Sequence, residues 1–208
     1  MTDHAANSQI MLEQKILEKI LEKRTIPKSF FQIVSAFEEK FNELNVVENS
    51  FLIKDYFGPN IGLAGAKKGL LAANKIKQSW IKPYQTKGGN YKYDIKGLYI
   101  FIHDKTPFYV GVSKGIISRI IQHLTGTTHN TSTLAYNIGL LRYEILTGTQ
   151  FKGKRNEFDF NSNVEPVKRF LLNQRIALMH IDNDEELYLF EIFCSMKLQT
   201  ILNKFETH

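Results

Sequence analysis

The sequence predicts an α+β fold in which a small antiparallel sheet of three strands is flanked by helices, with a mainly helical region before it. Two runs rich in β-branched and aromatic residues, 98–102 and 108–112, are separated by five residues that include Asp, Lys and Pro. This pattern is typical of an antiparallel hairpin. A third run of this kind covers 174–181, and stretches with a helical spacing of apolar residues surround all three.

The region before the sheet carries two predicted helices. Apolar residues recur at helical spacing through 8–23, with alternating Glu and Lys between them. Pro27 and Ser29 open a second helix, whose apolar positions continue to Leu44. Several glycines between 58 and 65 then mark a break. We therefore expect a helical N-terminal region over residues 1–66.

The positive charge of the chain is concentrated in one segment. The net charge is +6, yet residues 1–66 hold seven Lys or Arg against nine Asp or Glu, whereas 67–96 hold eight lysines against Asp94 alone. The segment also contains Trp80 and three tyrosines, and its first part has the spacing of a short helix over 66–80. Ammonium groups neutralise phosphates and aromatic rings stack on bases, so 67–95 is predicted to bind nucleic acid. A solvated lysine-rich surface loop is the alternative.

The lysines predicted to contact nucleic acid share this basic segment, with one addition that follows the hairpin. They are Lys67, Lys68, Lys75, Lys77, Lys82, Lys87, Lys92 and Lys114.

After the hairpin the helical period returns. Residues 113–124 predict a helix with an isoleucine-rich face, and Arg119 and His123 lie together on its other side. A helix over 133–146, a polar loop over 147–163 and a short helix opened by Pro166 follow. Asn183 with Glu186 three residues later has the pattern of a capping box for a last helix that runs to about residue 204.

Length and cysteine content narrow the class of protein. A chain of 208 residues and 24.0 kDa fits one domain with a substantial extension. Cys194 is the single cysteine, so no internal disulfide can form and an oxidising compartment is not indicated. The N-terminus lacks the pattern of a secretory signal, and no apolar run approaches the ~20 residues that span a bilayer. We expect a cytoplasmic protein without membrane association.

The last predicted helix places a carboxylate among apolar residues. On a helical wheel Glu191 falls within the stripe formed by Leu187, Cys194 and Leu198. An unpaired buried charge costs several kcal/mol, so Glu191 requires an arginine, a hydrogen-bond network or a metal ion. An ordinary buried ion pair is the simplest of these. The acidic residues at 182 and 184–186 are explained by the start of the helix, where negative charge is favoured, better than by a metal site.

The order of these residues resembles the GIY-YIG nuclease family. The resemblance rests on Gly97-Leu98-Tyr99, on Tyr109-Val110-Gly111, on Arg119 ten residues after Tyr109, and on Glu191 with Asn203 near the C-terminus. It covers roughly residues 96–203 and defines a nuclease-like domain over 96–208. It implies a three-stranded sheet flanked by helices, and metal-dependent hydrolysis of phosphodiesters. Several relatives place a lysine where this chain has Val112.

The resemblance also implies roles for single residues. Glu191 matches the glutamate that binds the metal, Arg119 the arginine that contacts phosphate, and Tyr99 and Tyr109 the two tyrosines of the motifs. His123 occupies a position where other members have tyrosine or histidine, and Asn203 matches an asparagine that some members carry. The predicted catalytic set is therefore Tyr99, Tyr109, Arg119, His123, Glu191 and Asn203.

The chemistry of these groups fits one divalent cation, Mg²⁺ or Mn²⁺, because a two-metal site needs more carboxylates than this set offers. Arg119 would stabilise the charge that develops on the scissile phosphate. The general base is open between Tyr109 and His123. We expect a double-stranded DNA endonuclease of restriction type that forms a homodimer, with residues 10–21 as one interface. A non-catalytic nucleic-acid-binding protein that retains the fold is the first alternative, and a protein-interaction module is the second.

Overall fold

The computed structural model describes residues 11–19, 30–58, 76–85, 91–128 and 130–203. The chain forms two compact units, residues 1–36 and 37–208. In the first unit, residues 11–19 are helical and α2 covers Phe30–Ser35. The second unit begins with α3, Phe37–Leu44. The predicted helix from Ser29 to Leu44 is therefore interrupted at Ala36, and the parts of 8–23 and 66–80 that are not in the ranges above lie outside the described residues.

The main sheet has four antiparallel strands in the order β1-β6-β4-β5, where three were predicted. β4 (Gly97–His103) and β5 (Thr106–Ser113) form the predicted hairpin, and β6 (Arg175–His180) pairs with the other edge of β4. The additional strand, β1 (Phe51–Leu52), pairs with β6 through Ile176 and Arg175. Two residues are too few to show an alternating pattern, which is why the sequence did not reveal this strand.

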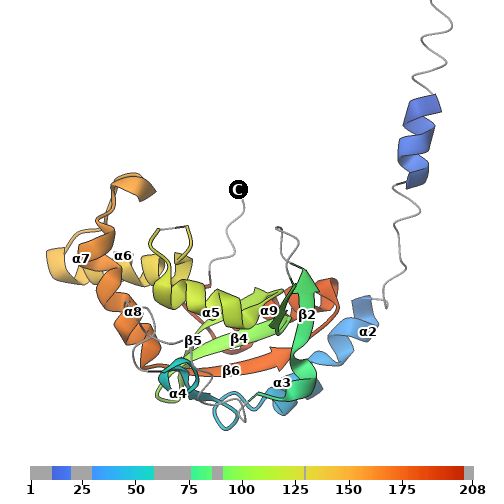
Figure 1. The fold of residues 1–208 in the computed structure, drawn as a ribbon, viewed down its shortest axis with the longest axis horizontal. Coiled ribbons are helices and arrows are strands. Elements are labelled where there is room, and N and C mark those ends of the chain that lie inside the picture. Colours follow the sequence, from blue (N-terminus) through green and yellow to red (C-terminus); the bar gives the residue numbers. More distant parts are fainter. Residues whose placement is uncertain (1–10, 20–29, 59–75, 86–90, 129, 204–208) are drawn as a thin grey trace, which may run out of the picture. The chain divides into compact units, whose positions relative to one another are not determined.

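The two faces of the sheet are covered by different helices (Figure 1). Tyr99 and Phe101 of β4 pack in one core with Ile116 and Ile120 of α5 (Ile116–Thr125). Residues 98, 100 and 102 alternate to the other face and are also fully buried. There α9 (Asp184–Lys197) runs against β5 and β4. α3 packs on α9, with the rings of Phe37 and Phe190 5.1 Å apart.

The remaining helices lie on the α5 side. These are α4 (Ile53–Phe57), α6 (Thr133–Thr147), α7 (Phe160–Asn163) and α8 (Glu165–Leu172). α6 matches its prediction, and α8 carries Pro166 in its first turn as predicted. The stretch 147–163 was predicted to be a loop, but it holds the 3₁₀ turn η3 (Arg155–Glu157) and α7, because Asp159 caps α7 by accepting a hydrogen bond from the amide of Ser162.

The last helix begins where predicted and ends earlier. The side chain of Asn183 accepts a hydrogen bond of 2.7 Å from the amide of Glu186, as expected for an N-cap. α9 stops at Lys197, whereas the prediction was about residue 204, and Gln199 follows with a left-handed φ of 52°.

A second, two-stranded sheet lies in the basic segment and was not predicted. β2 (Lys82–Gln85) pairs antiparallel with β3 (Tyr91–Asp94), and η2 (Gln78–Trp80) precedes β2. The alternation of Tyr91 and Tyr93 after Gly88-Gly89 was the available signal. We refer to β2 and β3 as the ribbon. Of the predicted nucleic-acid-binding lysines, Lys67, Lys68, Lys75 and Lys87 lie outside the described residues.

Within the described ranges, no helix is long and apolar enough to cross a bilayer.

Candidate active site

The hairpin places both motif tyrosines on one face of the sheet. Tyr99 pairs with Gly111, and Phe101 pairs with Tyr109, so Tyr99 and Tyr109 lie diagonally across the two strands with ring centroids 6.1 Å apart. The ring of Tyr99 crosses over Gly111: a Cβ at this glycine would lie 2.5 Å from the Tyr99 hydroxyl oxygen. The glycine of the second motif is therefore required for steric reasons.

The glycine of the first motif has a similar role at the start of β4. A Cβ at Gly97 would lie 3.0 Å from the Cα of His180 and closer still to the carbonyl oxygen of Met179. Gly97 thus allows β4 and β6 to approach where the hairpin begins. Both glycines of the resemblance have a structural explanation in the strand packing around Tyr99.

The N-terminus of α5 is held by Asp94, a residue that sequence reasoning did not assign to the site. Asp94 is only 3% exposed. Its Oδ1 accepts hydrogen bonds from the amides of Ile95 and Ile117, both 2.7 Å long, and its Oδ2 accepts one of 2.9 Å from Ser118. The carboxylate therefore caps α5 from a neighbouring strand. The signal in the sequence was that Asp94 is the only acidic residue among eight lysines.

α5 directs Arg119 and His123 toward the tyrosines. His123, predicted to lie on the side away from the apolar face, is fully buried. Its Nε2 lies 3.1 Å from the hydroxyl of Tyr99, and its ring is 6.4 Å from the ring of Tyr109. Burial lowers the pKa of His123 to about 3, and the nearby charge of Arg119 adds to this effect. The imidazole is therefore neutral at pH 7, and its Nδ1 has no hydrogen-bond partner in the described part of the chain.

Arg119 is the cation of this group. Its guanidinium donates to the side chain of Gln122 at 3.0 Å and reaches the carbonyl of Thr131 at 3.4 Å. Burial raises the pKa of Tyr99 well above its ordinary value, and interactions with Arg119 oppose the rise. The pKa of Tyr109 is also raised, by burial first, while hydrogen bonding with Tyr99 and the charge of Arg119 oppose it. Arg119 thus favours the phenolate form of either tyrosine.

Glu191 belongs to the helix that covers the other face of the sheet. It lies on α9, which packs against the edge strand β5, and its charge acts on Tyr109. The side chain is half-buried, and burial raises its pKa to about 7. Among the described residues no hydrogen bond or ion pair to the Glu191 carboxylate is present. The ion pair considered from the sequence is therefore not formed within this part of the chain.

Glu191 is the predicted metal ligand of this group. A half-buried carboxylate without a partner gains most when a cation approaches, because the cation removes the energetic cost of burying the charge. The described ranges contain no cluster of three or more His, Cys, Asp or Glu side chains that could enclose a metal. A cation held by Glu191 would therefore keep open positions for water and phosphate, as Mg²⁺ sites do.

Asn203 is bonded to the edge strand of the hairpin. Its Oδ1 accepts a 2.8 Å hydrogen bond from the amide of Val110, and its Nδ2 donates one of 2.7 Å to the carbonyl of Val110. The hydroxyl of Thr200 donates to the same Oδ1 at 3.0 Å. The amide of Asn203 is thus occupied by the free edge of β5 beside Tyr109. It positions the strand.

Three lysines, Lys82, Lys96 and Lys114, pair with acidic residues near the start of α9. Lys114, which follows β5, and Lys96 both approach the carboxylate of Asp184, at 3.8 and 3.0 Å. Lys82 pairs with Asp182 at 2.7 Å. Both carboxyl pKa values are lowered, chiefly by hydrogen bonds from Lys82 and Lys96. The acidic residues at the start of α9 are therefore bound by lysines, in addition to the favourable position at a helix N-terminus.

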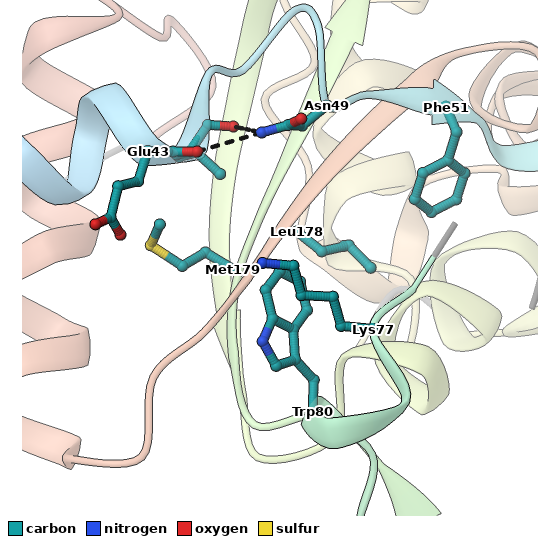
Figure 2. A pocket seen from close by; sticks show the side chains of 8 residues that line it. Glu43, Asn49, Phe51, Lys77, Trp80, Leu178 and Met179 are labelled. Atoms are coloured by element: carbon teal, nitrogen blue, oxygen red, sulfur yellow. Dashed lines mark hydrogen bonds between the residues drawn. The ribbon is translucent and has the colours of Figure 1, made fainter. Parts of the chain in front are cut away.

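A cavity of about 220 Å³ lies apart from these residues, between α3, β6 and the segment before the ribbon (Figure 2). Trp80 forms one wall, and the amine of Lys77 lies 5.2 Å from the centre of its ring. Asn49 turns its amide nitrogen away, toward the carbonyls of Glu43 and Leu44. None of the six predicted catalytic residues lines this cavity.

Comparison of the chain with models of known protein families, with curated proteins and with solved structures finds no match. The candidate site therefore depends on its own geometry: the rings of Tyr99, Tyr109 and His123 pack together, and the charges of Arg119 and Glu191 act on Tyr109.

Proposed function

We propose that the chain is a metal-dependent endonuclease that hydrolyses phosphodiester bonds in double-stranded DNA, with a site of the GIY-YIG type and a restriction-type role. The observation that carries this proposal is that the rings of Tyr99 and Tyr109 lie 6.1 Å apart, and that Arg119 and Glu191, a half-buried carboxylate without a partner among the described residues, are near enough for their charges to act on Tyr109. Residues separated by up to 92 positions meet in the order and with the types that the resemblance requires.

Glu191 would hold the cation, Mg²⁺ or Mn²⁺. When bound, such an ion polarises a phosphoryl oxygen and stabilises the leaving oxygen. Occupation by a cation also explains why a carboxylate with a pKa near 7 is placed here, since the ion favours the ionised form.

Arg119 would bind the scissile phosphate. The guanidinium is planar and always charged, and it can donate two parallel hydrogen bonds to phosphate oxygens. Its partners in the structure, Gln122 and Thr131, are exposed polar groups that it can exchange for a phosphate. The stabilisation of charge on the phosphate is an electrostatic contribution typically worth about 3 kcal/mol.

Of the two candidate general bases, Tyr109 and His123, we assign the role to Tyr109. His123 has a pKa near 3 and is fully buried, so it is a weak base without access to an attacking water. Tyr109 is partly exposed, and although burial raises its pKa, Tyr99 and the charge of Arg119 oppose this rise. His123 would instead fix the Tyr99 hydroxyl, so that Tyr99 and Arg119 together favour the ionised form of Tyr109.

The test is cleavage of supercoiled plasmid and of long linear DNA, with Mg²⁺ or with EDTA. The natural chain is compared with Glu191→Gln and with a control, Glu185→Gln, which changes an exposed glutamate in the first turn of the same helix. Discrete metal-dependent fragments that only Glu191→Gln loses support a site-specific enzyme, whereas a smear indicates a nonspecific one. If all three chains bind DNA and none cleaves it, the non-catalytic alternative replaces the proposal.

A further inference from the structure

The ribbon stands at the end of the main sheet where α5 and α9 begin (Figure 1). A two-stranded ribbon has little stability of its own, so it depends on its attachments. At its base Lys82 forms an ion pair with Asp182, which follows β6. At the end of its second strand, Asp94 is buried and bonded to the first amides of α5. The ribbon is thus fixed where the candidate active site begins.

The register of the ribbon separates its two faces. Lys82 pairs with Asp94, and the next pair is Pro83 with Tyr93. Because successive residues of a strand point to opposite faces, Tyr93 lies on the face opposite Asp94. Tyr93 is 72% exposed. This outer face therefore presents an aromatic side chain to solvent, without a ring contact or hydrogen bond to another described residue.

The charge of the ribbon favours a polyanionic partner. The stretch from Lys82 to Asp94 contains three lysines and one acidic residue, and that acidic residue is buried under α5. The remaining charge is positive. A two-stranded ribbon also has the width that the major groove of DNA admits.

The ribbon lies close to the proposed position of the scissile phosphate. Arg119 directly follows Ser118, whose amide Asp94 binds at 2.9 Å. The ribbon therefore ends within about one helical turn, ~5.4 Å of rise, from Arg119. Since DNA advances ~3.4 Å per base pair, contacts made by the ribbon fall within a few base pairs of the phosphate at Arg119.

We propose that the ribbon is a DNA-binding arm, whose outer face with Tyr93 contacts the duplex beside the cleavage site, while Lys82 on the opposite face anchors the base of the ribbon to Asp182. Asp94 is the positioning residue that joins this arm to α5, so that seating the arm on DNA places Arg119 at the phosphate. The inference rests on the proposed endonuclease function and names the element that engages the duplex next to the cut.

The test measures DNA binding and cleavage separately, in the full chain. Binding of a fluorescent 40-bp duplex is measured by anisotropy in the Glu191→Gln background, and cleavage is measured on plasmid with Glu191 intact. Tyr93→Ala is compared with Tyr93→Phe and with Ile145→Ala, which removes an 82% exposed apolar side chain from α6. Thermal unfolding of each variant checks the fold.

We expect Tyr93→Ala to weaken duplex binding at least about fivefold and to slow cleavage in proportion at subsaturating enzyme, because an aromatic contact with DNA is lost. Tyr93→Phe and Ile145→Ala stay within about twofold of the unmodified chain.

Unchanged affinity in Tyr93→Ala would overturn the arm, even while Glu191→Gln abolishes cleavage and so supports the endonuclease. If Tyr93→Ala lost affinity for an RNA duplex but kept its affinity for the DNA duplex, the DNA-binding arm would also be overturned. Failure of the unmodified chain to bind any DNA duplex overturns both proposals.

Discussion

The hydroxyl of Tyr99 lies 3.1 Å from Nε2 of His123, in a part of the core where both side chains are almost completely buried. Neither group is in the ionised form at neutral pH, because burial raises the pKa of Tyr99 and lowers that of His123. The hydrogen bond joins β4 to α5, and it fixes the tyrosine ring that lies over Gly111. His123 thus acts as a neutral support for Tyr99.

The buried His123 predicts a stability that declines in acid. Its folded pKa, about 3, is below the ordinary value of 6.5, so between these values the folded chain binds fewer protons than the unfolded chain. The contribution is complete above pH 6.5 and is lost as the pH falls to 3, by an amount on the order of 3 kcal/mol. Urea unfolding at pH 7, 5 and 4 should show a shallower decline in His123→Gln. Parallel declines in the two proteins would contradict this role.

The raised pKa of Glu191 predicts the opposite pH dependence of stability. Burial raises its folded pKa to about 7, above the ordinary 4.5, so the folded chain binds more protons and loses stability as the pH rises from 4.5 through 7. In EDTA at pH 8.5, Glu191→Gln should therefore be more stable than the natural chain by about 1 kcal/mol, after allowance for solvent screening. Added Mg²⁺ should raise the Tm of the natural chain and leave that of Glu191→Gln unchanged.

The control for this prediction is Glu185→Gln, an exposed change in the same helix. It should leave the pH dependence and the Mg²⁺ response of Tm as they are in the natural chain. An equal Mg²⁺ response in the natural chain and in Glu191→Gln would show that the cation binds elsewhere.

Arg119 predicts a loss of turnover without a comparable loss of stability. Arg119→Lys keeps the charge but cannot donate two parallel hydrogen bonds to a phosphate, so single-turnover cleavage should fall about 10²- to 10³-fold. Its contacts with Gln122 and Thr131 are exposed, so the free energy of unfolding should change by less than about 1 kcal/mol. Arg169→Lys, on the surface of α8, serves as the control. Cleavage that stays within threefold after Arg119→Lys would remove the arginine from the mechanism.

Asp94 predicts a large effect on folding from a residue outside the catalytic group. Asp94→Ala leaves three amides, those of Ile95, Ile117 and Ser118, without their acceptor, and should cost about 2–4 kcal/mol in urea unfolding. Asp159→Ala, which removes the exposed cap of the four-residue helix α7, should cost clearly less stability than Asp94→Ala. An equal loss in the free energy of unfolding in the two variants would show that Asp94 stabilises the fold no more than an ordinary exposed helix cap does.

The sequence predicted the local elements of the site better than their environment. The hairpin, α5 and the Asn183 cap follow from periodicity and capping, which act over a few residues. The pairing of β1 with β6 and the hydrogen bonds between Asp94 and α5 join segments that are distant in sequence. No local pattern in the sequence predicts them. The burial of His123 was missed for a related reason: the wheel of α5 has an isoleucine face, while a second face meets Tyr99 of the sheet.

The close approach of Gly111 to the Tyr99 ring predicts that Gly111→Ala lowers both stability and cleavage. A Cβ at Gly111 would overlap the Tyr99 ring, and φ is not left-handed there, so Gly111→Ala acts through this overlap rather than through backbone strain. Overpacking of a core costs about 1–3 kcal/mol, and it should displace the Tyr99 hydroxyl from His123 and reduce cleavage. Gly148→Ala is the converse control, since its φ is +70° and no atom lies within 4 Å of the added Cβ. In a Tyr99→Leu background, where the outer ring is gone, Gly111→Ala should cost at least about 1 kcal/mol less than in the natural chain, and a double-mutant cycle with no coupling would show that the two residues do not depend on each other.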